Sequence, residues 1–312
     1  MKKITAIFAA ITLAAALGGH SVLNAGNTEI NATTSAVKAD GSITRNYALG
    51  GFRKLEVGGK FQVKLTKSQS YSIKLTFPEE YEKRVFVRLE EDELKIGIDN
   101  NIFKNIEGEF IAEISMPMLR SLELNGAATL SCDDTFDLGR GGEFSLDLSG
   151  ASRVKSLSVK AGEIEGEFSG ASLCKMDGEF TEAELEFSGA AEGTMKLSGG
   201  TLKIDNSGAA KPKITGKFDW VSLEDSGAGE VTLEGSTESL SIDAGGAAKV
   251  KAGNFTAGNA TVETSGAASC TVNVTGSLTV RDASGASSIR YSGTDEVYLI
   301  SVGRAATVSK ID

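Results

Sequence analysis

The sequence predicts an all-β protein folded as a right-handed parallel β-helix (solenoid) of about ten coils of ~19 residues, with a strand-rich N-terminal cap layer. The first observation behind this prediction is a short phrase, Ser or Asn followed by Gly, Ala and another small residue, that recurs along the chain. After one interval of 24 residues, the copies follow one another every 19 or 20 residues. A period of about 20 residues is typical of solenoids. The glycine of each copy, or the residue that replaces it, serves as its anchor: Gly126, Gly150, Gly170, Gly189, Gly208, Gly227, Gly246, Gly266, Gly285 and Arg304.

The second observation is the alternation of apolar and polar residues on both sides of each anchor, which predicts strand, bend, strand. One inward column is expected four residues after the anchor, from Leu130 and Val154 onward. A second is expected four residues before it: Leu122, Leu146, Gly166, Leu185, Ile204, Leu223, Ile242, Val262, Arg281 and Ile300. No copy has the 3.6-residue period of a helical repeat, and propeller blades repeat at more than twice this length. The sixfold sub-repeat of the left-handed hexapeptide helix is also absent.

Four regions follow along the chain. Residues 1–25 have two lysines, an apolar core and then small residues, which predicts a secretory signal peptide. The polar, patternless residues 26–41 are expected to be a flexible leader, and residues 42–118 a β-rich N-terminal cap layer. Residues 119–312 form the predicted solenoid. No apolar run is long enough to anchor the exported chain in a membrane.

Within the cap layer, residues 55–63 echo the later repeat, and Glu56 occupies the place of a recurring acid. A short helix is expected over residues 79–84 because it follows Pro78. Residues 85–89 and 93–98 are predicted to form a β-hairpin whose turn is at 90–92. Atypical terminal layers are expected because the ends of a solenoid expose unpaired strands.

An acidic residue stands three positions before nine of the ten anchors, with Ser301 in the last copy. These acids form the expected partner-binding face: Glu123, Asp147, Glu167, Glu186, Asp205, Glu224, Asp243, Glu263 and Asp282. The simplest interpretation is a solvated strand face that favours solubility. The alternative is weak Ca²⁺ binding, for which the candidates are Asp205, Glu224, Asp225 and Asp243. A basic column five residues past the anchors is expected to lie nearby: Lys155, Lys175, Lys213, Lys251 and Arg290.

Residues 52–65 and the runs Met116-Pro117-Met118-Leu119 and Leu122-Glu123-Leu124-Asn125-Gly126-Ala127 resemble the putative auto-transporter adhesin, head GIN domain family. The resemblance covers about residues 40–310. It implies an exported β-helical protein of a family found mostly in the Bacteroidetes, with an adhesin role and no catalytic residues to transfer. No membrane-barrel segment follows the repeat, so the resemblance does not extend to the auto-transporter part of the name.

Other chemistry-bearing residues point to structural roles. Cys174 and Cys270 occupy one inward column about 24 Å apart, too far for a disulfide, and the three cysteines are expected to be buried free thiols. Asp225 and Asn206 fall two residues before their anchors, in a column of apolar residues. They are expected either to be a hydrogen-bonded buried pair or to mark a site.

Composition excludes several functions. Removal of residues 1–25 takes away the only histidine, His20, and leaves 30 basic and 42 acidic side chains. Histidine-based catalysis and histidine zinc sites are thereby excluded, and a net charge of −12 argues against a nucleic-acid partner. The sole tryptophan, Trp220, precedes a core-like segment, and aromatic residues for sugar stacking are scarce.

Three functions remain, and none requires a cofactor other than possible Ca²⁺. The first is a non-enzymatic adhesin or ligand-binding protein of the cell envelope, with a cell-surface glycan or protein partner. The second is a carbohydrate-active β-helix lyase or hydrolase that uses carboxylates and Ca²⁺. The third is a periplasmic structural or assembly factor. The expected location is the periplasm, the outer-membrane surface or the extracellular space.

Overall fold

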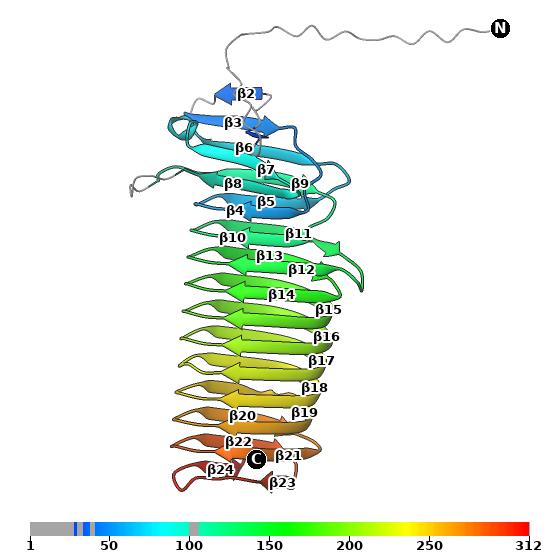
Figure 1. Cartoon of the computed structure of the whole chain (residues 1–312), viewed down its shortest axis with the longest axis vertical. Helices are drawn as coiled ribbons and strands as arrows, with labels where there is room; N and C mark the ends of the chain where they lie inside the picture. Colours follow the sequence, from blue (N-terminus) through cyan, green and yellow to red (C-terminus); the bar gives the residue numbers. More distant parts are fainter. Residues whose placement is uncertain (1–27, 30–33, 38–40, 100–105, 312) are drawn as a thin grey trace, which may run out of the picture.

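In the computed structural model, the chain winds into a parallel β-solenoid whose coils stack along one long axis (Figure 1). The structure describes residues 28–29, 34–37, 41–99 and 106–311, so the predicted signal peptide lies outside the described residues. Among these residues the only helix is the 3-10 turn η1 (Glu79–Tyr81). The solenoid has about nine turns, slightly fewer than the ten coils predicted, and the all-β solenoid prediction is confirmed. The right-handed sense of the winding stays a prediction.

Each coil contains two strand segments, joined by a bend at one edge and by the Gly-Ala phrase at the other. In β15 (Leu173–Phe187), side chains alternate between interior and solvent until Thr181 and Glu182, which both face solvent at the bend. The alternation then resumes at Ala183. Four further strands run through the bend in the same way: β16 (Glu192–Asn206), β17 (Lys211–Asp225), β18 (Glu230–Ala244) and β19 (Lys249–Thr264).

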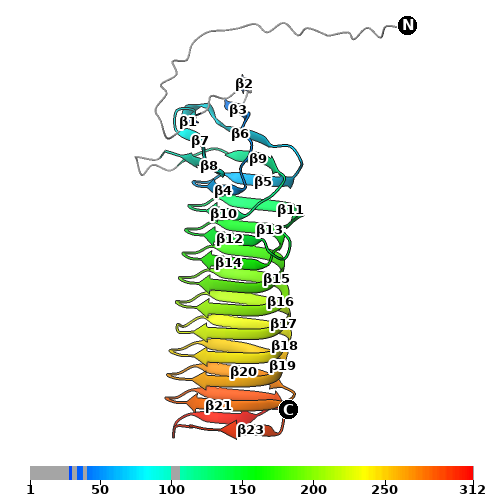
Figure 2. The same ribbon diagram turned by 45° about the vertical axis from the view of Figure 1, so that its right-hand side comes forward.

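In the remaining coils of the repeat region the two segments are separate strands. They are β10 (Ser121–Leu124), β11 (Thr129–Asp137), β12 (Glu143–Leu148), β13 (Arg153–Lys160), β14 (Glu163–Phe168), β20 (Ser269–Val274), β21 (Ser277–Ala283), β22 (Ser288–Gly293), β23 (Glu296–Leu299) and β24 (Thr307–Lys310). Together the segments build two walls, seen from two angles in Figures 1 and 2. The acidic wall consists of the segments before the anchors: β10, β12, β14, the second halves of β15 to β19, β21 and β23. The mixed-charge wall consists of the segments after them: β11, β13, the first halves of β15 to β19, β20, β22 and β24.

The Gly-Ala phrase stacks backbone directly on backbone at one edge of the solenoid. The amide of Ala171 donates to the carbonyl oxygen of Gly150 at 2.7 Å, and the same bond recurs between neighbouring phrases along the stack. Gly170 has a φ of +68°, and a Cβ on it would lie 2.6 Å from the Gly150 oxygen. Both the left-handed backbone and the close approach require glycine at this position.

Inward side chains of the two walls form one continuous apolar core. The predicted inward column before the anchors is correct except at the C-terminal end. There Val262 pairs with Val280 while Glu263 pairs with Asp282, so Arg281 is an extra residue in a β-bulge. The bulge turns Arg281 to solvent and leaves Val280 in the core. In the last coil, Ile300 is 70% exposed rather than inward.

The first coil in the sequence is enclosed between two later ones. It consists of β4 (Lys54–Val57) and β5 (Gln62–Lys67), and Glu56 aligns with Glu123 of β10. On its other side lie β8 (Glu93–Ile98) and β9 (Ile111–Met116), both parallel to it. Residues 55–63, which resemble the later repeat, therefore belong to a true coil of the solenoid. The parallel stack thus begins within residues 42–118, the segment that the sequence assigned to the cap layer.

Antiparallel strands cover this end of the stack. β3 (Ser42–Tyr47) pairs with β6 (Ser72–Pro78), β6 pairs with β9, and β7 (Val85–Glu90) forms the predicted hairpin with β8. The segment predicted as a flexible leader contains two short strands in its described part, because β7 and β3 offer free edges to it. These are β1 (Thr28–Glu29), which pairs with β7, and β2 (Thr34–Val37), which pairs with β3. The helix expected over 79–84 is limited to η1, followed by turns closed by short-range backbone hydrogen bonds.

Candidate functional site

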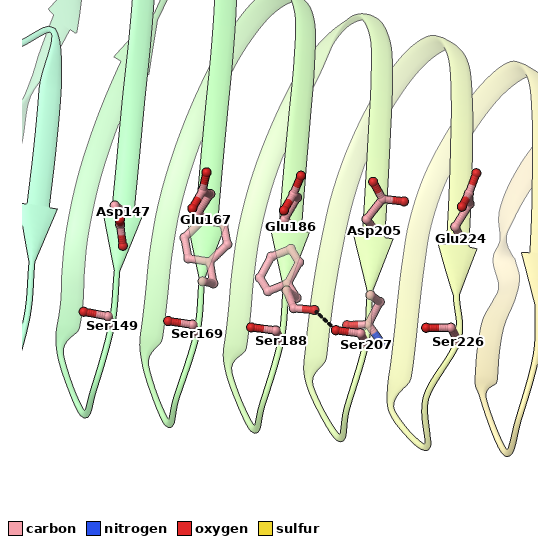
Figure 3. A pocket seen from close by; sticks show the side chains of 13 residues that line it. Asp147, Ser149, Glu167, Ser169, Glu186, Ser188, Asp205, Ser207, Glu224 and Ser226 are labelled. Atoms are coloured by element: carbon pink, nitrogen blue, oxygen red, sulfur yellow. Dashed lines mark hydrogen bonds between the residues drawn. The ribbon is translucent and has the colours of Figure 1, made fainter.

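The predicted acidic column is a straight ladder on the acidic wall (Figure 3). Strand register pairs each acid with the acid of the next coil, so their side chains lie about 4.8 Å apart at the strand spacing. Glu56 of the enclosed coil adds a tenth member next to Glu123. The acidic ladder comprises Glu56, Glu123, Asp147, Glu167, Glu186, Asp205, Glu224, Asp243, Glu263 and Asp282.

A groove runs beside the central part of this ladder. The acids form one bank, and the serines that precede the anchors form the other: Ser149, Ser169, Ser188, Ser207 and Ser226. Figure 3 shows the two rows running parallel across successive coils. Phe168, Phe187 and Asn206 also line the groove, and the two phenyl rings stack with centroids 4.5 Å apart. The groove therefore offers carboxylate and hydroxyl oxygens at every coil, which suits an extended partner.

Cations stand at both ends of the acidic ladder. Next to Glu56 in the stack is Lys95, whose Nζ lies 2.9 Å from a Glu56 oxygen, 3.0 Å from Glu93 and 3.4 Å from Glu90. Hydrogen bonds to Glu56 and Glu93 raise the pKa of Lys95. At the other end, Arg281 lies 3.5 Å from Glu263. The sequence interpretation missed Lys95 because only the stacking of β8 on β4 brings it to the ladder.

The ends of the acidic ladder differ in their protonation equilibria. Burial, together with the charges of Glu56 and Asp147, raises the pKa of Glu123, and burial also raises the pKa of Asp147. Asp282 accepts hydrogen bonds from Ser301 and Ser284, which lower its pKa. Glu123 and Asp147 therefore take up protons at higher pH than Asp282 does.

The four candidate Ca²⁺ ligands do not converge. Asp205, Glu224 and Asp243 follow one another along the exposed ladder, whereas Asp225 points into the core and is 1% exposed. Within the described part of the chain, one group of acids does bring its oxygens within 4.8 Å of one another: Glu184, Glu186 and Asp205. Glu184 lies on the same wall as the ladder, two residues before Glu186, and alternation along the strand could have identified it.

Asp225 and Asn206 form a buried pair on neighbouring coils, in the inward column to which the sequence assigned them. Asn206 Nδ2 donates to Asp225 Oδ1 at 3.1 Å, and the backbone amide of Gly227 donates to the same oxygen at 3.4 Å. Asp225 Oδ2 and Asn206 Oδ1 have no hydrogen-bond partner among the described residues. Burial raises the pKa of Asp225, and the two donors oppose this shift. Gly229 makes room for the pair, since a Cβ there would lie 2.5 Å from Asn206 Nδ2.

The basic column is on the mixed-charge wall, so it does not neutralise the acidic ladder. From Lys175 onward it alternates with threonine, as in Lys213, Thr232 and Lys251 on successive coils. Its lysines pair with acids of their own wall: Lys213 lies 2.9 Å from Glu234, and Lys251 contacts Glu230. The two walls therefore differ in charge balance.

The cysteines are free and buried, as predicted. Burial raises the pKa of the Cys132 thiol to about 11 and that of Cys270 to about 12. It raises the pKa of Cys174 as well. Thiolates are therefore scarce at neutral pH, and these cysteines are poor nucleophiles.

Trp220 lies just before a core-like segment, as the sequence indicated. It is 38% exposed on the outer side of the acidic wall, while Val221 and Leu223 point into the core. Because Val221 and Leu223 alternate with outward-facing residues, the same alternation predicts that Trp220 faces outward. Among the described residues, no helix has the length and apolar character needed to cross a membrane.

Solved structures that are similar to this chain include those of two Parabacteroides proteins. A crystal structure described as a putative lipid binding protein from Parabacteroides distasonis ATCC 8503 is similar at 16% identity and a TM-score of 0.50, covering 88% of this chain and 98% of that one. A putative adhesin from Parabacteroides merdae ATCC 43184 is similar at 17% identity and a TM-score of 0.46, with the same coverage. No curated protein matches the chain.

The family comparison covers most of the sequence. Residues 51–196 and 188–294 each match one family, so the match includes the enclosed coil and nearly all of the repeat. This agrees with the resemblance found in residues 52–65 and 116–127. The chain therefore belongs to the family described as putative auto-transporter adhesin, head GIN domain.

Proposed function

We propose that this protein is an exported, non-enzymatic adhesin that binds an extended cell-surface partner, glycan or protein, on its acidic wall. The observation that supports the proposal is the regular outer surface of that wall, where equivalent side chains recur on every coil beside a continuous groove. A repeated surface of this kind suits a partner that is itself extended or repetitive. Membership of an adhesin family is consistent with this role.

A non-enzymatic role is favoured by the chemistry of the surface. The ladder carboxylates recur with similar surroundings on successive coils, whereas a catalytic pair needs one acid and one base in distinct environments. The cysteines are buried with raised pKa values, and the only histidine lies in the predicted signal peptide.

The test compares the two walls. Cells that produce the protein are assayed for attachment to immobilised glycans and to host-cell matrix proteins, alongside a deletion strain. The double variant Glu167→Gln, Glu186→Gln changes the acidic wall, and Asp177→Asn, Glu192→Gln is the matched change on exposed acids of the mixed-charge wall. We expect the deletion and the acidic-wall variant to reduce attachment and the control to leave it unchanged. Attachment that is equal in the deletion strain and its parent would overturn the proposal.

A further inference from the structure

Two exposed aromatic side chains mark a region of the acidic wall that the acidic ladder does not explain. Trp220 is 38% exposed and Tyr298 is 53% exposed, and no other aromatic side chain among the described residues reaches this exposure. Both belong to the same wall, four coils apart, which corresponds to about 19 Å along the solenoid axis at the strand spacing. Isolated surface aromatics are common, but these two stand on adjacent outward rows of one wall.

The residues between them are polar and uncharged. On successive coils, the row of Trp220 continues through Ser239, Asn259 and Ser277, and the neighbouring row ends at Tyr298. We call this surface the polar patch: Trp220, Ser222, Ser239, Ser241, Asn259, Thr261, Ser277, Thr279 and Tyr298. The residues so named are uncharged, although the whole chain carries a net charge of −10. At the C-terminal end the row of Trp220 continues from Ser277 to Glu296, which borders the patch beside Tyr298.

The hydrogen-bonding groups of the patch are largely unused by the protein. The hydroxyls of Ser222, Ser239, Ser241, Thr261 and Thr279 make no hydrogen bond to the described part of the chain. Each can both donate and accept. Asn259 accepts from the hydroxyl of Ser277 at 2.9 Å, and Tyr298 Oη donates to Glu296 at 2.7 Å, which holds the phenol ring in place.

Charged residues border the patch on its flanks. Towards the N-terminus, the row of Ser222 continues into Lys203, which lies 2.9 Å from Glu182 and 3.9 Å from Glu184. The acidic ladder runs along one side, from Glu224 to Asp282. The short side chains of Thr201 and Ser239 flank Trp220 on the neighbouring coils, so the indole has no bulky residue beside it along the stack.

We propose that the polar patch binds an uncharged, linear glycan that lies along the solenoid axis, with sugar rings stacked on Trp220 and Tyr298. An aromatic face packs against the apolar face of a sugar ring while its surroundings exchange hydrogen bonds with the hydroxyls. A peptide fits less well. From β17 to β21 the strands under the patch are paired on both sides, and the open edge of β23 lies four coils from Trp220, so strand addition there would not cover the patch. This inference rests on the proposed adhesin function and specifies its partner.

The single tryptophan makes the test direct, because fluorescence excited at the long-wavelength edge, where tyrosine does not absorb, reports on Trp220 alone. The protein is titrated with cello-, laminari-, malto-, manno- and xylo-hexaose. At least one of these should change the fluorescence saturably, and its disaccharide should bind more weakly because it cannot reach both aromatic residues. By calorimetry, Trp220→Ala and Tyr298→Ala should each weaken binding by about tenfold.

Controls separate this inference from the proposed function and from misfolding. Thr232→Ala, on the mixed-charge wall, should bind like the parent, and Trp220→Phe should retain part of the affinity and a parental circular dichroism spectrum. No saturable binding by any of the hexasaccharides, or binding that survives Trp220→Ala, would overturn the proposal. If the acidic-wall variant loses attachment while the hexasaccharides do not bind, the result supports the adhesin function and contradicts the glycan site. A protein partner whose binding depends on Trp220 would also contradict the glycan assignment.

Discussion

At the scale of single residues, the turn glycines carry the stacking of the solenoid. Their positive φ and their contact with the carbonyl of the previous coil leave no room for a side chain, as at Gly150, where a Cβ would lie 2.7 Å from the Gly126 oxygen. Two phrases depart from this pattern: Gly227 does not have a positive φ, and Arg304 replaces glycine in the last coil. The φ of Arg304 is not in the left-handed region, so the side chain is tolerated there.

Gly170→Ala is expected to lower the free energy of unfolding by about 1–3 kcal/mol, because a non-glycine residue is strained at this φ and its Cβ meets the Gly150 oxygen. The matched control is Gly141→Ala, where a Cβ would have no neighbour within 4 Å and φ is not positive. Thermal unfolding of both variants checks the prediction. Equal changes in Tm would show that turn stacking does not depend on glycine.

The buried carboxyl of Asp225 should make stability depend on pH. Its folded-state pKa is raised above the ordinary value, so folding favours the protonated form. The resulting penalty is absent below the unfolded-state pKa of about 3.9, grows as pH rises through the interval up to the folded-state pKa, and is then constant. Asp225→Asn removes the charge and should stabilise the protein by about 1–3 kcal/mol at pH 7.

The measurement is Tm from pH 3 to pH 8 for Asp225→Asn and for the exposed control Asp177→Asn. We expect the advantage of Asp225→Asn to disappear near pH 3, and the control to show no comparable trend. An advantage that is the same at every pH would mean that ionisation of Asp225 is not the cause.

At the scale of elements, the acidic ladder is a row of like charges that the strand register enforces. Two unit charges at this spacing repel by about 1 kcal/mol even at the dielectric constant of water. Lys95 and Arg281 relieve the repulsion only at the ends, since the basic column lies on the other wall. The acidic wall therefore retains unfavourable electrostatic repulsion between its carboxylates, which a bound partner could reduce.

Glu167→Gln combined with Glu186→Gln should raise Tm at low ionic strength, and the gain should shrink at about 1 M salt because the charges are screened. Glu192→Gln is the contrasting control, because Glu192 is paired in register with Lys211 on the mixed-charge wall. That variant should lower Tm slightly or leave it unchanged. A gain that does not respond to salt would exclude repulsion within the ladder as its origin.

At the scale of the whole molecule, the two ends of the stack differ. The N-terminal end is covered by antiparallel strands, and its first coil is held between two others. In the last coil, β23 pairs only with β21 and β24 only with β22, and exposed apolar side chains gather there: Leu299, Ile300, Val302 and Ile311. Stability in such a stack is approximately a sum over neighbouring coils.

Deletion of residues 296–312 should leave a folded solenoid with a modestly lower Tm, because only one coil interface is lost. A chain that starts at residue 69 should fail to fold, because it loses the enclosed coil and both of its interfaces. Circular dichroism and thermal unfolding distinguish the two outcomes. Equal tolerance of both deletions would argue against the importance of the enclosed coil.

Much of the fold could be predicted from the period and the alternation of the sequence. A 19-residue repeat fixes which residues share a column, and alternation decides which columns face inward. The acidic ladder, the buried pair of Asp225 and Asn206 and the buried thiols follow from these two facts. The core-like segment after Trp220 follows from the same alternation, which also places Trp220 itself outside.

Tertiary structure alone decided the features that depend on contacts between segments distant in sequence. Lys95 reaches Glu56 only because β8 stacks on β4, an order that reverses the order of the chain. The bulge at Arg281 shifts the inward position, so that it no longer falls four residues before the anchor. The basic column is separated from the acidic ladder by the bend that divides each coil between the two walls. A local repeat specifies the column to which a side chain belongs, because the backbone alternates with a fixed period. It does not specify how the stack ends or which columns face each other, because these are set by packing between coils and between walls.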